Sequence, residues 1–142
     1  MKSVKNNLVK LLTVTVLITL LFSTATFSQT NSIKDLTDHK YALENLTTGI
    51  NSDNAGVRKS AVYFAGKYKI EELVSVLADR LDKENDPSVR LLIAYSLYEI
   101  NDAEGMKAVK ELSLSDVDAK VKRMSKNLYN EYLLNHSTTA AL

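Results

Sequence analysis

The stretch DPSVR at residues 86–90 is the strongest indication of the fold, because close copies of it stand 32 residues before and 32 residues after it. The earlier copy is NAGVR at residues 54–58, and the later copy is DAKVK at residues 118–122. A fixed period between about 20 and 50 residues is typical of proteins that are built from stacked repeats. The spacing therefore predicts a repeat architecture before any local pattern is considered.

Hydrophobic residues recur at helical spacing on both sides of each copy, which predicts helices throughout the repeat region. Asp86 is a strong start signal, because its carboxylate can accept hydrogen bonds from the first free amides while proline at the first helical position loses none. Asp53 or Asn54 can cap an earlier helix that runs to about Tyr68. The other predicted helices cover residues 34–50, 70–83, 87–101, 103–113 and 118–134.

The helices agree in their core positions when they are superposed at the 32-residue offset, with Val57, Val89 and Val121 as the first match. The side chains predicted to face the core are Leu36, Leu43, Leu46, Ile50, Val57, Ala61, Phe64, Ala65, Tyr68, Ile70, Leu73, Val74, Leu77, Leu81, Val89, Leu92, Ile93, Leu97, Ile100, Met106, Val109, Leu112, Val121, Met124, Ser125, Leu128, Tyr129 and Tyr132. Only four Gly and one Pro occur, which favours helices over a turn-rich β fold. We predict an all-α fold, a short right-handed α-solenoid of about three helical hairpins.

The repeated phrase resembles the HEAT-repeat family, in particular the short bacterial repeats that are also found in phycobilin lyase-like proteins. The resemblance covers roughly residues 34–134 and implies a HEAT-like fold that binds other molecules far more often than it catalyses. Three positions depart from the family pattern. Lys122 replaces the usual arginine, Asn54 replaces the usual aspartate, and Tyr129 stands where a small or aliphatic residue is expected.

The N-terminal segment, residues 1–28, has the composition of a secretory signal peptide. Three lysines precede an apolar run over residues 11–22, and small residues follow it. We predict cleavage after Ser28, with cleavage after Ala25 as the alternative, and hence a secreted or periplasmic protein. The other alternative is an uncleaved membrane anchor, although the apolar run is shorter than the roughly 20 residues that a span needs. The remaining parts are a polar tether at 29–34, the repeat domain at 35–135 and a flexible tail at 136–142.

Charge and composition exclude several function classes. Residues 1–28 hold three Lys and no acid, so the remainder carries 15 basic and 17 acidic residues, which makes a poor nucleic-acid binder. The chain has no Cys, which excludes disulfides and thiolate metal sites. His39 and His136 are far apart, and the His-Glu pairs of the family's metal-dependent hydroxylases do not occur. We therefore predict no metal, no cofactor and no catalytic set, so the chain is not expected to be an enzyme.

A row of cations recurs with the repeat period. Arg58, Arg90 and Lys122 are equally spaced at the 32-residue offset, and an Asn or Asp stands one helical turn before each. The row predicts either an anion-binding ladder or ion pairs that lock the stacking of the repeats, and the family resemblance supports the ion pairs. We assign a structural ladder to Arg58, Asp86, Arg90, Asp118 and Lys122.

The outward faces of the second helices indicate where a partner binds, because in a solenoid these faces line the inner surface. They hold five acids and one Lys, which favours a basic protein partner. The predicted partner-binding residues are Glu44, Glu72, Val76, Asp79, Glu104, Lys107, Ala108 and Glu111. An alternative docking patch is formed by Leu91, Tyr95 and Tyr98, for which packing between neighbouring repeats is the simpler explanation.

These patterns predict an exported, non-catalytic protein–protein interaction module that acts as an adaptor or scaffold. One alternative is an accessory or lyase-like protein related to the bilin lyase repeats. A second alternative is an envelope assembly factor that the N-terminal segment anchors in the membrane, which would be the protein's only contact with the bilayer.

Overall fold

The computed structural model describes residues 41–139. The predicted signal peptide, the tether and residues 140–142 lie outside the described residues. The described range contains no strand, and the prediction of an all-α fold is confirmed. The helices are α3 (Ala42–Ile50), α4 (Ala55–Lys67), α5 (Val74–Lys83), α6 (Pro87–Ile100), α7 (Ala103–Ser115) and α8 (Ala119–Thr139), with the 3₁₀ helix η1 (Glu71–Leu73) directly before α5.

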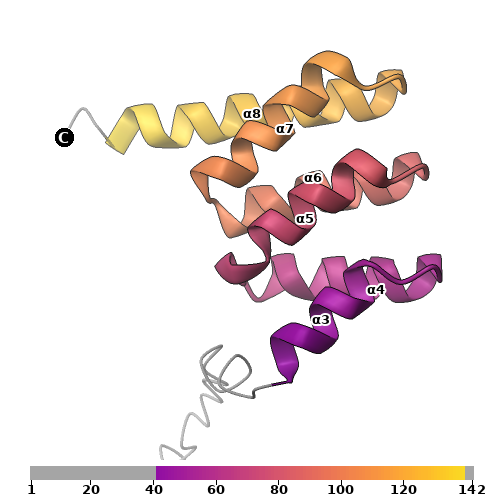
Figure 1. The fold of residues 1–142 in the computed structure, drawn as a ribbon. Coiled ribbons are helices and arrows are strands. Elements are labelled where there is room, and N and C mark those ends of the chain that lie inside the picture. The colour runs from indigo at the N-terminus through magenta and orange to yellow at the C-terminus, as the bar shows by residue number, and fades with distance from the viewer. Residues whose placement is uncertain (1–40, 140–142) are drawn as a thin grey trace, which may run out of the picture. The chain divides into compact units, whose positions relative to one another are not determined.

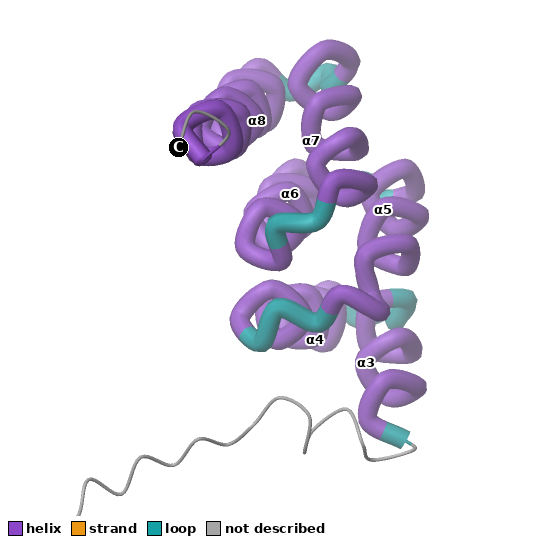
Figure 2. The backbone as a smooth tube through the Cα atoms, turned by 90° about the vertical axis from the view of Figure 1, so that its left-hand side faces the viewer, coloured by secondary structure: helices purple, strands orange, loops and turns teal. Residues whose placement is uncertain are grey.

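The helices form two layers (Figures 1 and 2). In the first layer α4 packs on α6, and α6 packs on α8. In the second layer α3 contacts α5, and α5 contacts α7. The loops from α3 to α4, from α5 to α6 and from α7 to α8 lie at the same end of the stack, on the right in Figure 1. This is the predicted short α-solenoid of helical hairpins.

The first residue of each repeated phrase caps a first-layer helix. Asn54 Oδ1 accepts hydrogen bonds from the amides two and three residues ahead, at 2.9 and 3.3 Å. Asp118 Oδ1 accepts the equivalent pair at 2.8 and 2.9 Å. Asp86 Oδ1 accepts from the amide of Ser88 at 2.8 Å, and Pro87 occupies the first helical position as predicted. These bonds satisfy amides that have no partner within the helix, so the repeated phrase marks where each helix begins.

The largest differences between the predicted and observed helix bounds occur at three helices, and α7 also ends two residues later than predicted, at Ser115. Of the predicted helix 34–50, the described part begins at Ala42, because Tyr41 lies in a turn; residues 34–40 are not described. The predicted helix 70–83 opens with η1 before the α-helical turns begin. α8 runs on to Thr139 and so includes residues 136–139, which the sequence places in the tail.

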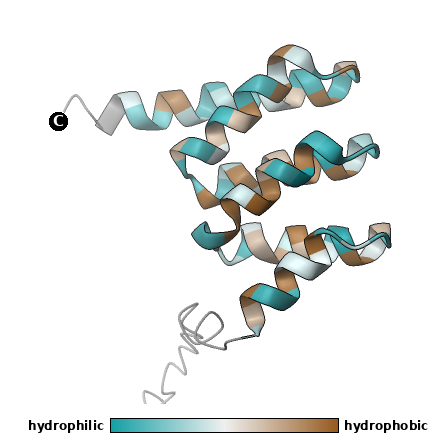
Figure 3. Cartoon of the chain, in the orientation of Figure 1, coloured by the Kyte–Doolittle hydropathy of each residue, from teal (hydrophilic) through white to brown (hydrophobic). Residues whose placement is uncertain are grey.

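The core lies where the helices pack on one another, and each described helix carries both hydrophobic and hydrophilic residues (Figure 3). The five predicted core residues of the segment 70–83 are all buried, and so are the predicted core valines of α6, α7 and α8. The buried hydrophobic residues are Ile50, Ala61, Val62, Ala65, Ile70, Leu73, Val74, Leu77, Leu81, Val89, Ile93, Ala94, Leu97, Ile100, Met106, Val109, Leu112 and Val121.

The predicted core of α4 is wrong at two positions. Val57 is 46% exposed and Phe64 is 42% exposed, whereas Val62, which was not predicted, is fully buried. Val62 lies on the side of α4 that packs on α6, one turn from Gly66, which approaches Ser96 of α6. Phe64 lies on a different side of α4. Its repeat equivalent on α6, Ser96, is buried because α4 packs on that side of α6. No described helix packs on the corresponding side of α4, so Phe64 stays partly exposed.

The predicted core side of α8 departs from a fully buried, apolar surface at two positions. Met124 is 38% exposed, because it lies at the edge of the buried side of the helix. Ser125 is fully buried as predicted, and it stands where α4 and α6 have Ala61 and Ile93. Its hydroxyl has no hydrogen-bond partner, so this position places an unsatisfied polar group in the core.

No helix within residues 41–139 combines the length and the apolar character that crossing a bilayer requires.

Candidate interaction surface

Buried ion pairs join successive repeats at the loop end of the stack. Arg58 of α4 donates from Nε to Glu84 Oε2 at 2.9 Å and from Nη2 to Glu84 Oε1 at 3.2 Å. Arg90 of α6 makes the same two-point contact with Asp116, at 2.7 and 2.9 Å. Glu84 and Asp116 are repeat equivalents, and each stands in the loop before the next first-layer helix. The pairs therefore repeat with the period of the sequence.

Each arginine also ties down the loop in front of its own helix. Nη1 of Arg58 donates to the carbonyls of residues 52 and 53, at 2.9 and 2.8 Å. Nη1 of Arg90 donates to the carbonyls of residues 84 and 85, at 3.2 and 3.1 Å. One guanidinium thus links its own loop to the loop of the following repeat, which a lysine with a single charged nitrogen cannot do in this geometry.

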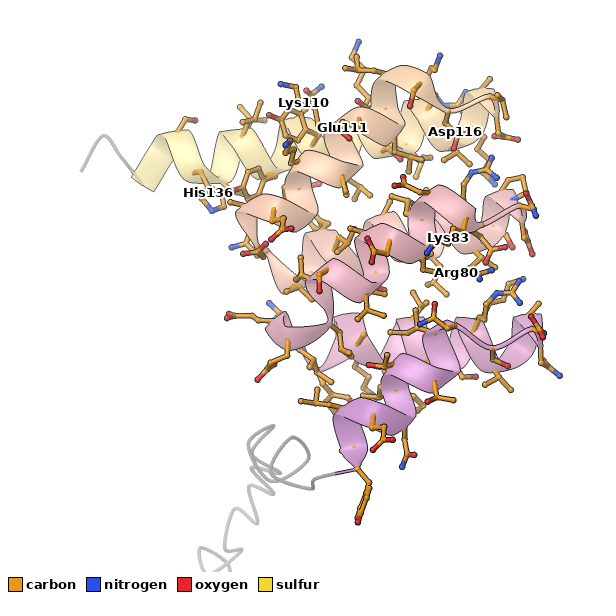
Figure 4. All side chains as sticks on the ribbon, viewed as in Figure 1. Arg80, Lys83, Lys110, Glu111, Asp116 and His136 are labelled. Atoms are coloured by element: carbon orange, nitrogen blue, oxygen red, sulfur yellow. The ribbon has the colours of Figure 1, made fainter. Side chains whose placement is uncertain are left out.

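Both acids are held ionised. Burial alone would raise the pKa of Glu84, but hydrogen bonds from the amide of Asp86 and from the Arg80 and Arg58 guanidinium groups lower it to about 2. The hydrogen bond from Arg90 lowers the pKa of Asp116, against the opposing effect of burial. Figure 4 shows Asp116 and Arg80 at the loop end of the helices. The charge pairs at this end are internal, so they do not form an anion-binding surface.

The structure gives the predicted ladder residues different roles. Arg58 and Arg90 form the two joints described above, but their partners are Glu84 and Asp116, which the sequence analysis missed. Asp86 and Asp118 are helix caps, and Asp86 also lies 3.3 Å from Lys59 Nζ in a half-exposed ion pair. A signal for the missed partners was present, since both stand just before a cap and recur at the 32-residue offset.

The predicted partner-binding residues all lie on the second layer. Glu44 is on α3, Glu72 is in η1, and the others are on α5 and α7. The five acids and Lys107 are exposed or half-exposed, and Val76 and Ala108 are half-buried. The structure brings five of the eight together around a groove of about 270 Å³ between α5 and α7. These five are Asp79, Glu104, Lys107, Ala108 and Glu111.

The groove is acidic, with a narrow apolar floor. Asp79 and Asp82 line it from α5, and Glu104 and Glu111 line it from α7, opposed by the single cation Lys107. Within residues 41–139, no salt bridge engages any of these side chains. Leu81 and Leu112, both nearly buried, form part of the lining. The groove can therefore accept a cationic side chain whose aliphatic stem lies on the leucines.

The groove also contains residues that sequence reasoning did not select. Asp82 lies one turn after Asp79 on the same side of α5, and Ser115 lies one turn after Glu111 on α7. Helical spacing from the selected residues could have found both. Glu44, Glu72 and Val76, which the sequence pattern also selected, do not line this groove.

The alternative aromatic patch is only partly exposed. Tyr95 is 48% exposed, but Tyr98 and Leu91 are half-buried, and Tyr98 packs against the core. Burial, together with a hydrogen bond to Glu131 of α8, raises the pKa of Tyr98. Packing between repeats thus occupies much of this stripe. Tyr63 of α4 lies beside Tyr95 at a second groove, of about 250 Å³.

Of the two histidines, only His136 lies in the described part of the chain. His136 is exposed on α8, with Nδ1 2.8 Å from the carbonyl of Tyr132 and its ring 4.1 Å from the Tyr132 ring centre. Figure 4 places it near the end of α8, away from Asp116. Residues 41–139 hold no cluster of three His, Asp or Glu side chains that could bind a metal ion. His39 lies outside the described residues.

Comparison with known proteins gives one match. A family model described as HEAT repeats matches residues 43–127, which is more than half of the chain. No curated protein matches the chain. No solved structure matches it either.

Proposed function

Because the chain belongs to the HEAT-repeat family, we propose that it is an exported, non-catalytic adaptor that binds a basic protein partner in the acidic groove between α5 and α7. HEAT repeats in general mediate protein–protein interactions, and the family is typically a scaffold without catalysis. The proposal adds three points to this general role: the compartment, the binding surface and the charge of the partner.

The observation that carries the proposal is the set of unpaired acids along one groove. Several other acids have internal roles: Glu84 and Asp116 are in buried ion pairs, and Asp86, Asp102 and Asp118 cap helices. The groove acids have no such structural task among the described residues. Exposed charges of this kind mainly speed association and confer salt dependence, and each contributes about 0–1 kcal/mol.

The binding surface is tested by charge reversal. The chain with Glu104→Lys and Glu111→Lys should capture less of its partner from the native envelope fraction, and capture by the unaltered chain should fall in high salt. A matched control, Asp53→Lys with Glu71→Lys, makes the same change in net charge outside the groove and should leave capture intact. Val89→Asp places a charge in the core and should unfold the chain, which shows how lost folding appears in the assay.

One outcome would move the site elsewhere. If the groove variant keeps full capture while Tyr95→Ser abolishes it, the partner binds the aromatic surface of α4 and α6 and the acidic groove is not the site.

Export is tested separately by the mass of the protein recovered outside the cytoplasm. We expect a chain that lacks residues 1–28. An intact N-terminus in the membrane fraction would instead support an anchored protein, without bearing on the groove.

A further inference from the structure

A third groove, opposite in charge to the acidic groove, lies between α7 and α8. It has a volume of about 440 Å³, and its lining includes Lys110, Lys122, Arg123 and Lys126 but no acid. Leu114, which is 69% exposed, and Tyr129 supply apolar surface within it. Lys110 Nζ lies 5.7 Å from the centre of the Tyr129 ring, so this cation is held over the groove by the aromatic face.

The ion pairs of the two preceding repeats indicate which chemical group Lys122 is suited to bind. Arg58 and Arg90 each bind the carboxylate that stands at the start of the following repeat, Glu84 and Asp116. Lys122 is the third member of the row, one repeat period after Arg90. It is exposed and makes no ion pair with any of residues 41–139. Because the equivalent cation of both preceding repeats binds a carboxylate, Lys122 is suited to bind a carboxylate as well.

The outer side of α8 indicates that the occupant is not another repeat of the same kind. The side of α4 that packs on α6 carries the fully buried Val62, and the equivalent residue of α6 is the fully buried Ala94. The equivalent residue of α8 is Lys126, which is exposed and lines the groove. A helix that stacked here as α6 stacks on α4 would bury this ammonium group without a partner, which is costly. The occupant must bring carboxylates of its own.

We propose that the groove between α7 and α8 binds an acidic segment of a protein partner, with one of its carboxylates beside Lys122 in the position that Glu84 and Asp116 take beside Arg58 and Arg90. Lys126 and Arg123 take further carboxylates, and Leu114 with Tyr129 contacts apolar side chains of the segment. A peptide suits this mixed lining better than a bare phosphate, because the apolar part of the groove is then also covered. The site is independent of the acidic groove, and α7 contributes to both.

The test uses the full chain and a fluorescein-labelled short peptide of alternating glutamate and leucine, followed by anisotropy at low salt. We expect binding that Lys122→Glu with Lys126→Glu weakens at least ten-fold. Lys122→Arg should retain binding, because arginine is the residue of the other two ladder positions. The matched control, Lys69→Glu with Lys83→Glu, makes the same change in net charge at lysines outside the groove and should change the affinity less than two-fold.

Four outcomes would overturn the proposal. The first is that the unaltered chain does not bind the peptide, and the second is that the control variant loses as much affinity as the groove variant. The third is that inorganic phosphate or phosphatidylglycerol vesicles compete at the groove more strongly than unlabelled peptide, which would make it a phosphate site. The fourth is self-association of the chain that Lys122→Glu abolishes, which would make a second copy the occupant. The groove lysines are exposed, and an unchanged melting curve of each variant separates lost binding from lost folding.

Discussion

At the scale of single residues, carboxylate side chains have two distinct tasks where successive repeats are joined. Asp86 and Asp118 cap helices, while Glu84 and Asp116, just before them in the chain, bind the arginine of the preceding repeat. The two tasks are coupled, because Glu84 also accepts the amide of Asp86 at 3.0 Å and Asp116 accepts the amide of Asp118 at 2.7 Å. The loop conformation that places the cap therefore also places the ion pair.

The buried ion pair predicts a large loss of stability for Glu84→Ala. The variant leaves the buried Arg58 guanidinium without its carboxylate, which typically costs about 3–5 kcal/mol. Urea unfolding followed by circular dichroism measures the loss. The control is Lys59→Ala, which removes the half-exposed pair with Asp86 and should cost no more than about 1 kcal/mol. Equal losses for the two variants would show that the buried joint does not stabilise the stack.

At the scale of elements, α4 and α6 approach closely because Gly66 has no side chain. A Cβ at Gly66 would lie 2.7 Å from Cα, Cβ and Oγ of Ser96. The Ser96 hydroxyl uses this proximity, since it donates to the carbonyl of Val62 at 3.0 Å. The contact fixes how the first-layer helices stack, and it brings Lys59 of α4 within reach of Asp86.

This contact predicts that Gly66→Ala destabilises the protein, although alanine is the better helix former by about 1 kcal/mol. The added methyl group meets backbone atoms of α6, and such overpacking costs about 1–3 kcal/mol. Thermal unfolding should show a lower midpoint. Gly56→Ala serves as the comparison, because Gly56 is exposed and its nearest obstacle is the side-chain oxygen of Asn54 at 3.2 Å. A higher midpoint for Gly66→Ala would mean that α4 and α6 are free to separate.

At the scale of the described domain, the two signs of charge are separated into two grooves. The groove between α5 and α7 carries four acids against one Lys, and the groove between α7 and α8 carries four cations and no acid. α7 separates them, and Figure 4 shows Lys110 and Glu111, one from each groove, as neighbours on this helix. A single helix, α7, thus borders two grooves of opposite charge.

The lowered pKa values predict loss of stability in acid. The pKa of Glu84 falls from its ordinary value of 4.5 to about 2 on folding, and that of Asp116 is also lowered. As the pH falls, these acids take up protons in the unfolded chain before they do so in the folded chain. Their contribution to the free energy of unfolding is therefore complete above about pH 5 and declines as the pH falls toward 2. Glu84 alone accounts for a loss of about 3 kcal/mol.

Urea midpoints measured between neutral pH and the acid limit would show this decline. The Glu84→Ala variant should show a shallower decline, because it lacks the acid whose pKa falls furthest on folding. A midpoint that stays constant down to about pH 3 would contradict the assignment of these acids as buried and ionised.

The helical elements and the residues at which they begin could be predicted from the sequence alone. Periodic hydrophobic positions and cap residues act over one or two helical turns, so a pattern such as DPSVR specifies its helix without reference to the rest of the chain. The repeat period also determined that equivalent helices would stack, and hence that acids such as Glu104 and Glu111 would fall on one layer. These features were predictable because each depends on local spacing.

The contacts between residues of different helices could be seen only in the tertiary structure. Several acids in the sequence were possible ion-pair partners of Arg58, and the geometry of the loop places Glu84 beside it. The sequence pattern predicted Phe64 as a core residue of α4, but the close packing of α4 on α6 buries Val62 instead. The two grooves likewise arise from side chains of different helices. Such contacts depend on the distance and angle at which whole helices pack, which no single segment of sequence contains.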